Sequence, residues 1–285
     1  MFSFITTTYA WLSLSTVVSV SNIELNAKDS YDLELSLDGI NYYEKIPSEL
    51  ILQKLANLKF VDLTSQDGLT FMGLYEGSEA PRANRDYLSL QFHFRTNNRR
   101  YTEIHLTNHV KNLDFETNSE GTYIVSRGQS FQNKVDFNYS EDEVIEAGTV
   151  RKYYASEAMR VAINSEDLSV PKIFDLSNNP IRGFGYSFGA IDYFHKNNNV
   201  ELIPPNAPEV ITEMSEISSE MPVALTFDSY LLSLKENSET NYYEGMIEIN
   251  IWLEGWDADA FDAILKDLIK IQFEFVAVAP NELFE

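Results

Sequence analysis

Apolar and polar residues alternate along the first part of the chain. Leu12, Leu14, Val18 and Val20 fall on one face of an extended segment, and serines occupy most of the positions between them. This period of two is typical of a half-buried β-strand, whereas a membrane-spanning helix needs about twenty predominantly apolar residues and has no reason to alternate. We therefore expect residues 1–27 to form a strand that docks into a sheet of its own subunit or of a neighbour.

The same segment lacks the basic region with which a cleaved secretory signal begins, because the first Lys or Arg of the chain is Lys28. We interpret residues 1–27 either as a signal-derived segment or as a retained strand that is donated to a neighbouring subunit. The residues expected to form the donor-strand interface are Phe2, Phe4, Leu12, Leu14, Val18 and Val20.

The clearest strand pattern elsewhere is Tyr87–Arg95, in which four apolar residues alternate with polar ones. Further strands are expected at residues 31–37, 69–75, 103–106, 134–139, 159–163, 223–227, 246–253 and 269–278. Short strands separated by turns that contain Asn, Gly or Pro, without a regular alternation of strands and helices, predict a mainly β fold. We expect residues 28–285 to form a single jelly-roll-like β-sandwich domain.

Two short helical insertions are expected in this sandwich, near residues 48–59 and 257–268. Ser48 is the candidate N-cap of the first helix and Asp257 that of the second, and apolar residues recur at helical spacing after each. Several prolines and acidic residues over positions 197–221 predict a long surface loop.

Composition adds a strong negative charge to this picture. The 285 residues include 44 Asp and Glu against 21 Lys and Arg, which gives a formal net charge of −23 at pH 7. Because such a field repels phosphate groups and anionic membranes, we expect no nucleic-acid partner, and we expect no membrane span in the mature chain. The chain has no Cys, which excludes disulfides, thiolate metal sites and cysteine nucleophiles.

One motif associated with catalysis is present. Gly185 to Gly189 match the G-x-S-x-G elbow that exposes a hydrolase serine, here Ser187. The only later histidine is His195, with Asp192 as the only acid between, so the order and spacing of a triad are absent. An aromatic and glycine-rich turn explains the stretch better, and we predict no enzymatic activity and no catalytic residue.

Clustered carboxylates raise the question of a metal. Glu254, Asp257, Asp259 and Asp262 lie within nine residues and are weak candidates for a Ca²⁺ site, because Ca²⁺ prefers carboxylate oxygens. The order of an EF-hand loop is missing, and a helix capped by Asp257 explains the same residues without a metal. The histidines at positions 93, 105 and 109 come with no identifiable third ligand for zinc. We therefore predict no cofactor, with Ca²⁺ as the alternative.

Two tyrosine pairs favour a second class of function. Tyr42, Tyr43, Tyr242 and Tyr243 form two aromatic pairs that look exposed and are suited to stacking on sugars, although tyrosines on strand edges usually pack against their neighbours. The alternative to a polymer is a monomeric cell-surface module that binds a glycan or a protein.

Segments at both ends and in the middle of the chain resemble a known group. Tyr9–Ser13, the Val/Ser strand after it and Leu33–Gly39 resemble the N-terminal region of exported Gram-positive surface proteins related to TasA and camelysin. Ala158–Ile163 and Ile251–Ala260 are similar to segments that recur in secreted proteins with such N-termini. In that group, an Ala-aromatic junction such as the one at Ala10 lies near the end of the signal peptide.

The resemblance implies a jelly-roll sandwich, export and, in several members, fibres formed by donation of the N-terminal strand to the next subunit. With the alternating N-terminal segment, it predicts an extracellular structural subunit that polymerises with copies of itself into a surface or matrix filament. Other cell-surface proteins or glycans are the further partners expected. A secreted hydrolase or metalloprotease is the least favoured function, since the chain has neither H-E-x-x-H nor a workable triad.

Overall fold

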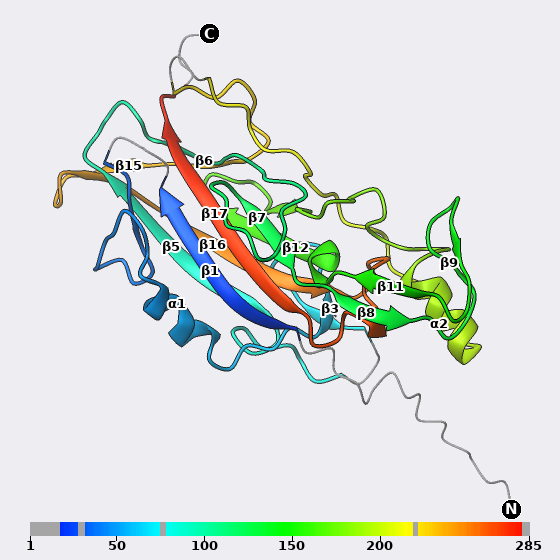
Figure 1. The fold of residues 1–285 in the computed structure, drawn as a ribbon. Helices are drawn as coiled ribbons and strands as arrows, with labels where there is room; N and C mark the ends of the chain where they lie inside the picture. Colours follow the sequence, from blue (N-terminus) through cyan, green and yellow to red (C-terminus); the bar gives the residue numbers. More distant parts are fainter. Residues whose placement is uncertain (1–17, 28–31, 75–77, 219–221, 281–285) are drawn as a thin grey trace, which may run out of the picture.

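The computed structural model describes residues 18–27, 32–74, 78–218 and 222–280, and places them in two main β-sheets that pack face to face (Figure 1). The core lies between these sheets. Phe92 and Phe94 of one sheet contact Phe275 of the other, with ring centroids 6.0 and 5.1 Å apart. The arrangement confirms the predicted mainly β sandwich with short helices.

The first sheet brings together segments from the two ends of the described chain. β1 (Ser19–Ala27) pairs in parallel with β17 (Leu268–Val278), and Figure 1 shows these two strands side by side in blue and red. The opposite edge of β17 pairs with β7 (Tyr123–Ser126) and β6 (Glu103–Leu106), and β14 (Tyr230–Ser233) follows β6.

The second sheet is built around β16 (Tyr242–Glu254), which pairs with β5 (Leu88–Thr96) on one edge and β12 (Met159–Ser165) on the other. Five short strands extend this sheet: β2 (Glu34–Ser36), β3 (Asp62–Thr64), β4 (Met72–Gly73), β13 (Lys172–Phe174) and β15 (Lys235–Asn237). The long central strands give the sheet a broad outer face, which carries the candidate site described below.

β5 has the alternation that its sequence predicts. Its inward residues are at most 4 % exposed and are Leu88, Leu90, Phe92 and Phe94. The polar residues between them lie on the outer face of the sheet. Because successive side chains of a strand point to opposite faces, the local sequence was sufficient to assign both faces of this strand.

The described part of the N-terminal segment belongs to its own sandwich. Val18 is fully buried and forms a bridge with Phe60, and Val20 is partly buried against the core. These two residues of the expected donor strand therefore contact their own subunit. The sequence had left open whether the segment docks into its own subunit or into a neighbour. Residues 1–17, with Phe2, Phe4, Leu12 and Leu14, lie outside the described residues.

The outer edge of β1 is covered at both ends. The Ala27 amide donates to the Glu44 carbonyl, the Ile46 amide to the Leu25 carbonyl, and the Phe60 amide to the Val18 carbonyl. α1 (Ser48–Leu55) follows this cover segment and packs against β1. Covering an edge in this way prevents another strand from adding to it.

The first predicted helix is present as α1, although Pro47 rather than Ser48 stands at its N-cap position and no side chain caps it. The sequence did not predict α2 (Ala190–Asn198). Outside the two main sheets, the described residues include two small antiparallel strand pairs and a 3₁₀ turn. The pairs are β8 (Gln129–Gln132) with β11 (Val150–Tyr153) and β9 (Phe137–Asn138) with β10 (Val144–Ile145), and the turn is η2 (Ala155–Ala158). Among the described residues, no helix is long and apolar enough to cross a bilayer.

The helix predicted for residues 257–268 was wrong. That stretch is a buried loop with a short 3₁₀ turn, η3 (Asp262–Ile264). Its backbone pairs instead with the segment before α2, because the Gly185 amide donates to the Trp256 carbonyl and the Ala258 amide to the Gly183 carbonyl. These tertiary bonds take the place of the local bonds that a helix would need.

Candidate functional site

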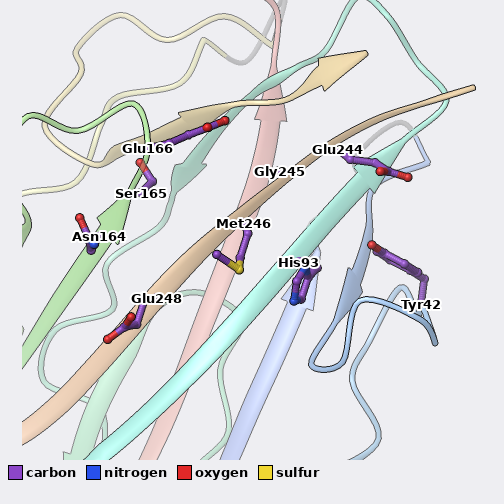
Figure 2. A pocket seen from close by; sticks show the side chains of 9 residues that line it. All are labelled: Tyr42, His93, Asn164, Ser165, Glu166, Glu244, Gly245, Met246 and Glu248. Atoms are coloured by element: carbon purple, nitrogen blue, oxygen red, sulfur yellow. The ribbon is translucent and has the colours of Figure 1, made fainter. Parts of the chain in front are cut away.

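A cleft of about 410 Å³ lies on the outer face of the second sheet (Figure 2). β16 contributes its floor, β5 and β12 flank it, and the loop after β2 reaches its rim through Tyr42. Figure 2 shows Met246 in the middle of the cleft, with Asn164 and Glu248 on one side and His93 on the other.

Strand register explains why these side chains meet. Met246 lies opposite His93 on β5, and Glu248 lies opposite Asn164 on β12. Residues that oppose one another on adjacent strands point to the same face, so all four project outward. The cleft therefore follows from the pairing of strands that are far apart in the sequence.

Three carboxylates line the cleft. Glu244 accepts hydrogen bonds from the Asn237 amide (2.8 Å) and the Thr240 hydroxyl (2.8 Å), and Glu248 accepts one from the Asn250 amide (3.0 Å). Glu166 pairs with Lys235 at 2.6 Å. None of the described residues that line the cleft is Lys or Arg, but Arg95 and Lys235 lie opposite Glu244 on the two neighbouring strands.

A stacked arginine borders the cleft. The Arg95 guanidinium lies 4.0 Å from the centroid of Tyr42 and 4.5 Å from that of Tyr242, and it pairs with Glu34 at 2.6 Å. Burial raises the pKa of the Tyr42 hydroxyl. The other members of the tyrosine pairs, Tyr43 and Tyr243, pack against the core. The structure thus brings Tyr42 and Tyr242 together around a guanidinium.

A buried network holds the carboxylates that the sequence suggested for Ca²⁺. The Arg160 guanidinium pairs with Asp257 at 2.5 Å and with Asp175 at 3.0 Å, and all three side chains are at most 3 % exposed. Arg182 pairs with Asp259 at 2.8 Å and also donates to the Tyr139 carbonyl. Burial raises the pKa of Asp257, and the Arg160 charge opposes that rise.

Glu254 and Glu157 complete the acidic surroundings of this network. Glu254 is fully buried and accepts hydrogen bonds from the Trp252 indole (3.0 Å) and the Trp256 amide (3.2 Å). Burial raises the pKa of Glu254, and burial with the nearby Asp259 charge raises that of Glu157 to about 7.

The network does not collect the four candidate calcium ligands. Asp257 and Asp259 each face an arginine, Glu254 faces the two tryptophan N–H groups, and Asp262 lies on η3. Within the described ranges, no group of three or more His, Asp or Glu side chains is placed to hold a metal ion. The sequence suggested these residues because carboxylates are crowded there. In the structure Asp257 and Asp259 form ion pairs with arginines, and Glu254 accepts hydrogen bonds.

The G-x-S-x-G stretch forms the entry to α2. Ser187 is exposed, and Gly189 occupies the N-cap position with a φ of +64°. A Cβ on Gly189 would come 2.4 Å from the Ala258 carbonyl oxygen, so close backbone contact and a left-handed conformation both require glycine there. His195 lies on α2, where its Nδ1 contacts the Val200 carbonyl.

One Ser-His-Glu arrangement was missed by the sequence. His105 Nδ1 lies 3.0 Å from the Ser215 hydroxyl, and its Nε2 lies 4.0 Å from Glu103. His105 is fully buried and Ser215 is 5 % exposed, so a substrate has no access to either, and burial lowers the pKa of His105. No local sequence pattern predicts the contact between His105 and Ser215, because 110 positions separate the two residues.

Comparison with known proteins gave no matching family model, no matching curated protein and no matching solved structure.

Proposed function

We propose that this protein is an extracellular structural subunit that polymerises by exchange of its N-terminal strand. The observation that carries the proposal is the position of β1. Among the described residues it is the first strand, it lies at the edge of its sheet, and it pairs with β17. The alternating apolar segment before it extends the same strand pattern.

Strand exchange preserves the contacts that β1 makes. A β1 from a neighbouring copy would meet β17 in the same register, with Ile23 opposite Ile271 and Leu25 opposite Phe273. Exchange of an identical element between subunits therefore requires few new contacts. When every subunit both donates and accepts, the contact is head to tail and propagates an open filament.

Burial of Val18 and β1 determines the strength of the strand joint, which is the same in the closed monomer and in the exchanged polymer. Val18, Ile23 and Leu25 are at most 2 % exposed, and each such side chain contributes about 1.5 to 3 kcal/mol on burial. The three together contribute roughly 5 to 9 kcal/mol before ordering costs are subtracted. A joint of this strength persists without disulfides, which this chain lacks.

The cell-surface location and the homopolymer also draw support from the resemblance of the N-terminal region to exported fibre-forming proteins. The competing hydrolase is disfavoured by the enclosed position of His105 and Ser215. The glycan-binding module is weakened because Tyr42 and Tyr242 each direct a ring face towards Arg95.

A cysteine pair tests the proposal directly, because the chain has no other cysteine. Glu24 lies opposite Gln272 in the β1 and β17 register, a spacing that suits a disulfide between adjacent strands. The Glu24→Cys, Gln272→Cys protein should give a ladder of linked subunits on a non-reducing denaturing gel. Negative-stain electron microscopy should show filaments with a repeat of about 40 Å, one domain diameter.

A pair of Glu24→Cys with Glu239→Cys, on the exposed turn before β16, is the control and should give no ladder. If the first pair runs entirely as an internally linked monomer and the wild-type protein forms single particles, strand exchange is refuted.

A further inference from the structure

A segment that crosses the outer edge of β1 is anchored to other parts of the molecule at both of its ends. At one end, Leu35 of β2 and Tyr43 exchange main-chain hydrogen bonds of 2.7 and 2.8 Å. At the other end, the Lys59 amide donates to the Arg85 carbonyl at 2.8 Å, shortly before β5 begins. Residues 44–58, between these anchors, are named the edge strap. Its two ends are fixed without any contribution from β1.

Between its anchors, the backbone of the edge strap is bonded to β1. The Ile46 amide donates to the Leu25 carbonyl at 3.3 Å, and the Glu44 carbonyl accepts from the Ala27 amide at 3.2 Å. Among the described residues, the other main-chain hydrogen bonds of the strap stay within it. Breaking its bonds to β1 would therefore free the strap from the edge and leave the ladders of both sheets in place.

Side chains of the edge strap close the same edge. The Lys45 ammonium pairs with Glu24 at 2.7 Å. Ile46 and Ile51 are at most 2 % exposed and belong to the core that contains the buried residues of β1. The middle of the strap is α1, which has only eight residues and no side-chain cap. Because a helix this short is not stable alone, α1 depends on its packing against β1.

β1 is thus held along two edges by different parts of the chain. β17 pairs with one edge, and the edge strap covers the other, with α1 on the side of β1 that faces away from β17 (Figure 1). Main-chain groups of β1 are bonded on both sides, so a strand leaves or enters this position only when the strap opens. Proteins open locally in cooperative units of this kind at a lower free energy than global unfolding requires.

We propose that the edge strap is a latch that controls the release and uptake of β1, so that its opening sets the rate of strand exchange. This inference rests on the proposed function, because a latch on β1 regulates assembly only where β1 is exchanged. Opening of the strap is nevertheless a property of the single subunit and is measured without assembly.

Native-state hydrogen exchange of the full chain measures the opening. The amides of Ile46 and Ala27 join the strap to β1, whereas Ile249 lies in β16, which is paired on both edges. The first two amides should exchange together and at least about tenfold faster than that of Ile249. Exchange of all three at one common rate would show that the strap opens only with the whole fold, and would overturn the proposal.

A covalent link between strap and strand tests the control of assembly. The Glu24→Cys, Lys45→Cys protein is linked through its two thiols by a short bis-alkylating reagent while it is monomeric. Linkage should slow both Ile46 exchange and filament growth at least about tenfold relative to the same variant with each thiol alkylated separately. The control links Lys111→Cys to Glu213→Cys, which replace an ion pair of 3.0 Å elsewhere on the surface, and should change neither rate.

A loosened strap should have the opposite effect. Ile51→Ala removes the buried contact of α1 and should speed Ile46 exchange at least about tenfold. Ile173→Ala, a matched truncation of a 5 % exposed residue on β13, should leave that exchange unchanged. Unaltered Ile46 exchange or unaltered filament growth after linkage would overturn the latch. If the wild-type protein forms single particles only, strand exchange alone is refuted, and the hydrogen-exchange results still decide whether the strap holds β1.

Discussion

Arg160 lies at the centre of an ion-pair group in the buried network that joins β12 to the loop after β16. Its guanidinium is the partner of both Asp175 and Asp257, and none of the three side chains is more than 3 % exposed. Removal of one partner from a buried ion pair leaves an uncompensated charge, which is more damaging than loss of the pair itself.

Arg160→Met should therefore lower the free energy of unfolding by about 3 to 5 kcal/mol. Lys111→Met removes a surface pair with Glu213, in which both side chains are at least 40 % exposed, and should change stability by less than about 1 kcal/mol. Urea denaturation of both variants measures the difference. Similar effects of the two substitutions would contradict the role given to Arg160.

Glu157 makes stability depend on pH. Burial, followed by the charge of Asp259, raises its pKa from 4.5 to about 7 in the folded state. Between these values the folded protein holds a proton that the unfolded chain has released, so stability is complete below about pH 4.5 and falls as the pH rises through 7.

Glu157→Gln keeps the hydrogen-bonding shape and cannot ionise. At pH 8 it should be more stable than the wild-type protein by on the order of 1 to 2 kcal/mol, allowing for partial exposure, and equal to it near pH 4. Chemical denaturation at a series of pH values provides the measurement. The exposed Glu141→Gln is the control, and a similar profile for it would refute the assignment to Glu157.

At this scale the sequence located the acidic residues but not their role. Asp257 was assigned as a helix cap because the residues near it have helical spacing. Its actual partner, Arg160, is 97 positions away. The residues next to Asp257 in the sequence contain no information about the Arg160 charge, which only the fold brings close to Asp257.

At the scale of elements, two turns on the second sheet share one design. Ser36-Leu37-Asp38-Gly39 follows β2 and Ser65-Gln66-Asp67-Gly68 follows β3, and in both the serine hydroxyl donates to the aspartate while the glycine amide donates to the serine. Both glycines have φ near +70°. Ser-x-Asp-Gly stands at both turns in the sequence, a signal that was not used to predict them.

Gly68 has a second reason to be glycine. A Cβ there would come 2.3 Å from the Ala162 Cβ, whereas Gly148, which also has positive φ, has nothing within 4 Å of its Cβ position. Gly148→Ala should lower stability by about 1 to 2 kcal/mol through backbone strain alone. Gly68→Ala adds overpacking and should lower it by about 2 to 4 kcal/mol. Thermal denaturation that ranks the two in the reverse order would contradict this explanation.

Strands were predicted better than helices for a physical reason. The alternation in β5 is a local property that holds wherever the strand pairs, and the structure retains it. The helical spacing after Asp257 was equally clear, but the backbone of that loop bonds to the segment before α2. Residues 223–227 were expected as a strand and make only single bridges, at Val223 and Ala224.

At the scale of the whole molecule, β1 closes the first sheet. Removal of residues 1–27 would leave β17 without its parallel partner and would expose the core sites of Ile23 and Leu25. The truncated chain should unfold or aggregate at temperatures at which the full chain is stable.

A synthetic peptide of residues 18–27, added in trans, should restore a cooperative unfolding transition to the truncated chain. The same peptide with Ile23 and Leu25 replaced by Asp should not. A truncated chain that folds with unchanged stability would show that β1 is dispensable, and differential scanning calorimetry distinguishes these outcomes.

The sequence by itself determined the fold class and the inward and outward faces of its clearest strand, because the period of a strand and the chemistry of a turn are set by neighbouring residues. It also determined the strong negative charge and the absence of disulfides. The tertiary structure decided which carboxylate meets which arginine, that β1 lies beside β17, and that Met246, Glu244 and Glu248 line one cleft. These features arise from contacts between positions that are distant in the sequence, and their geometry is fixed only when the strands pair and the chain folds.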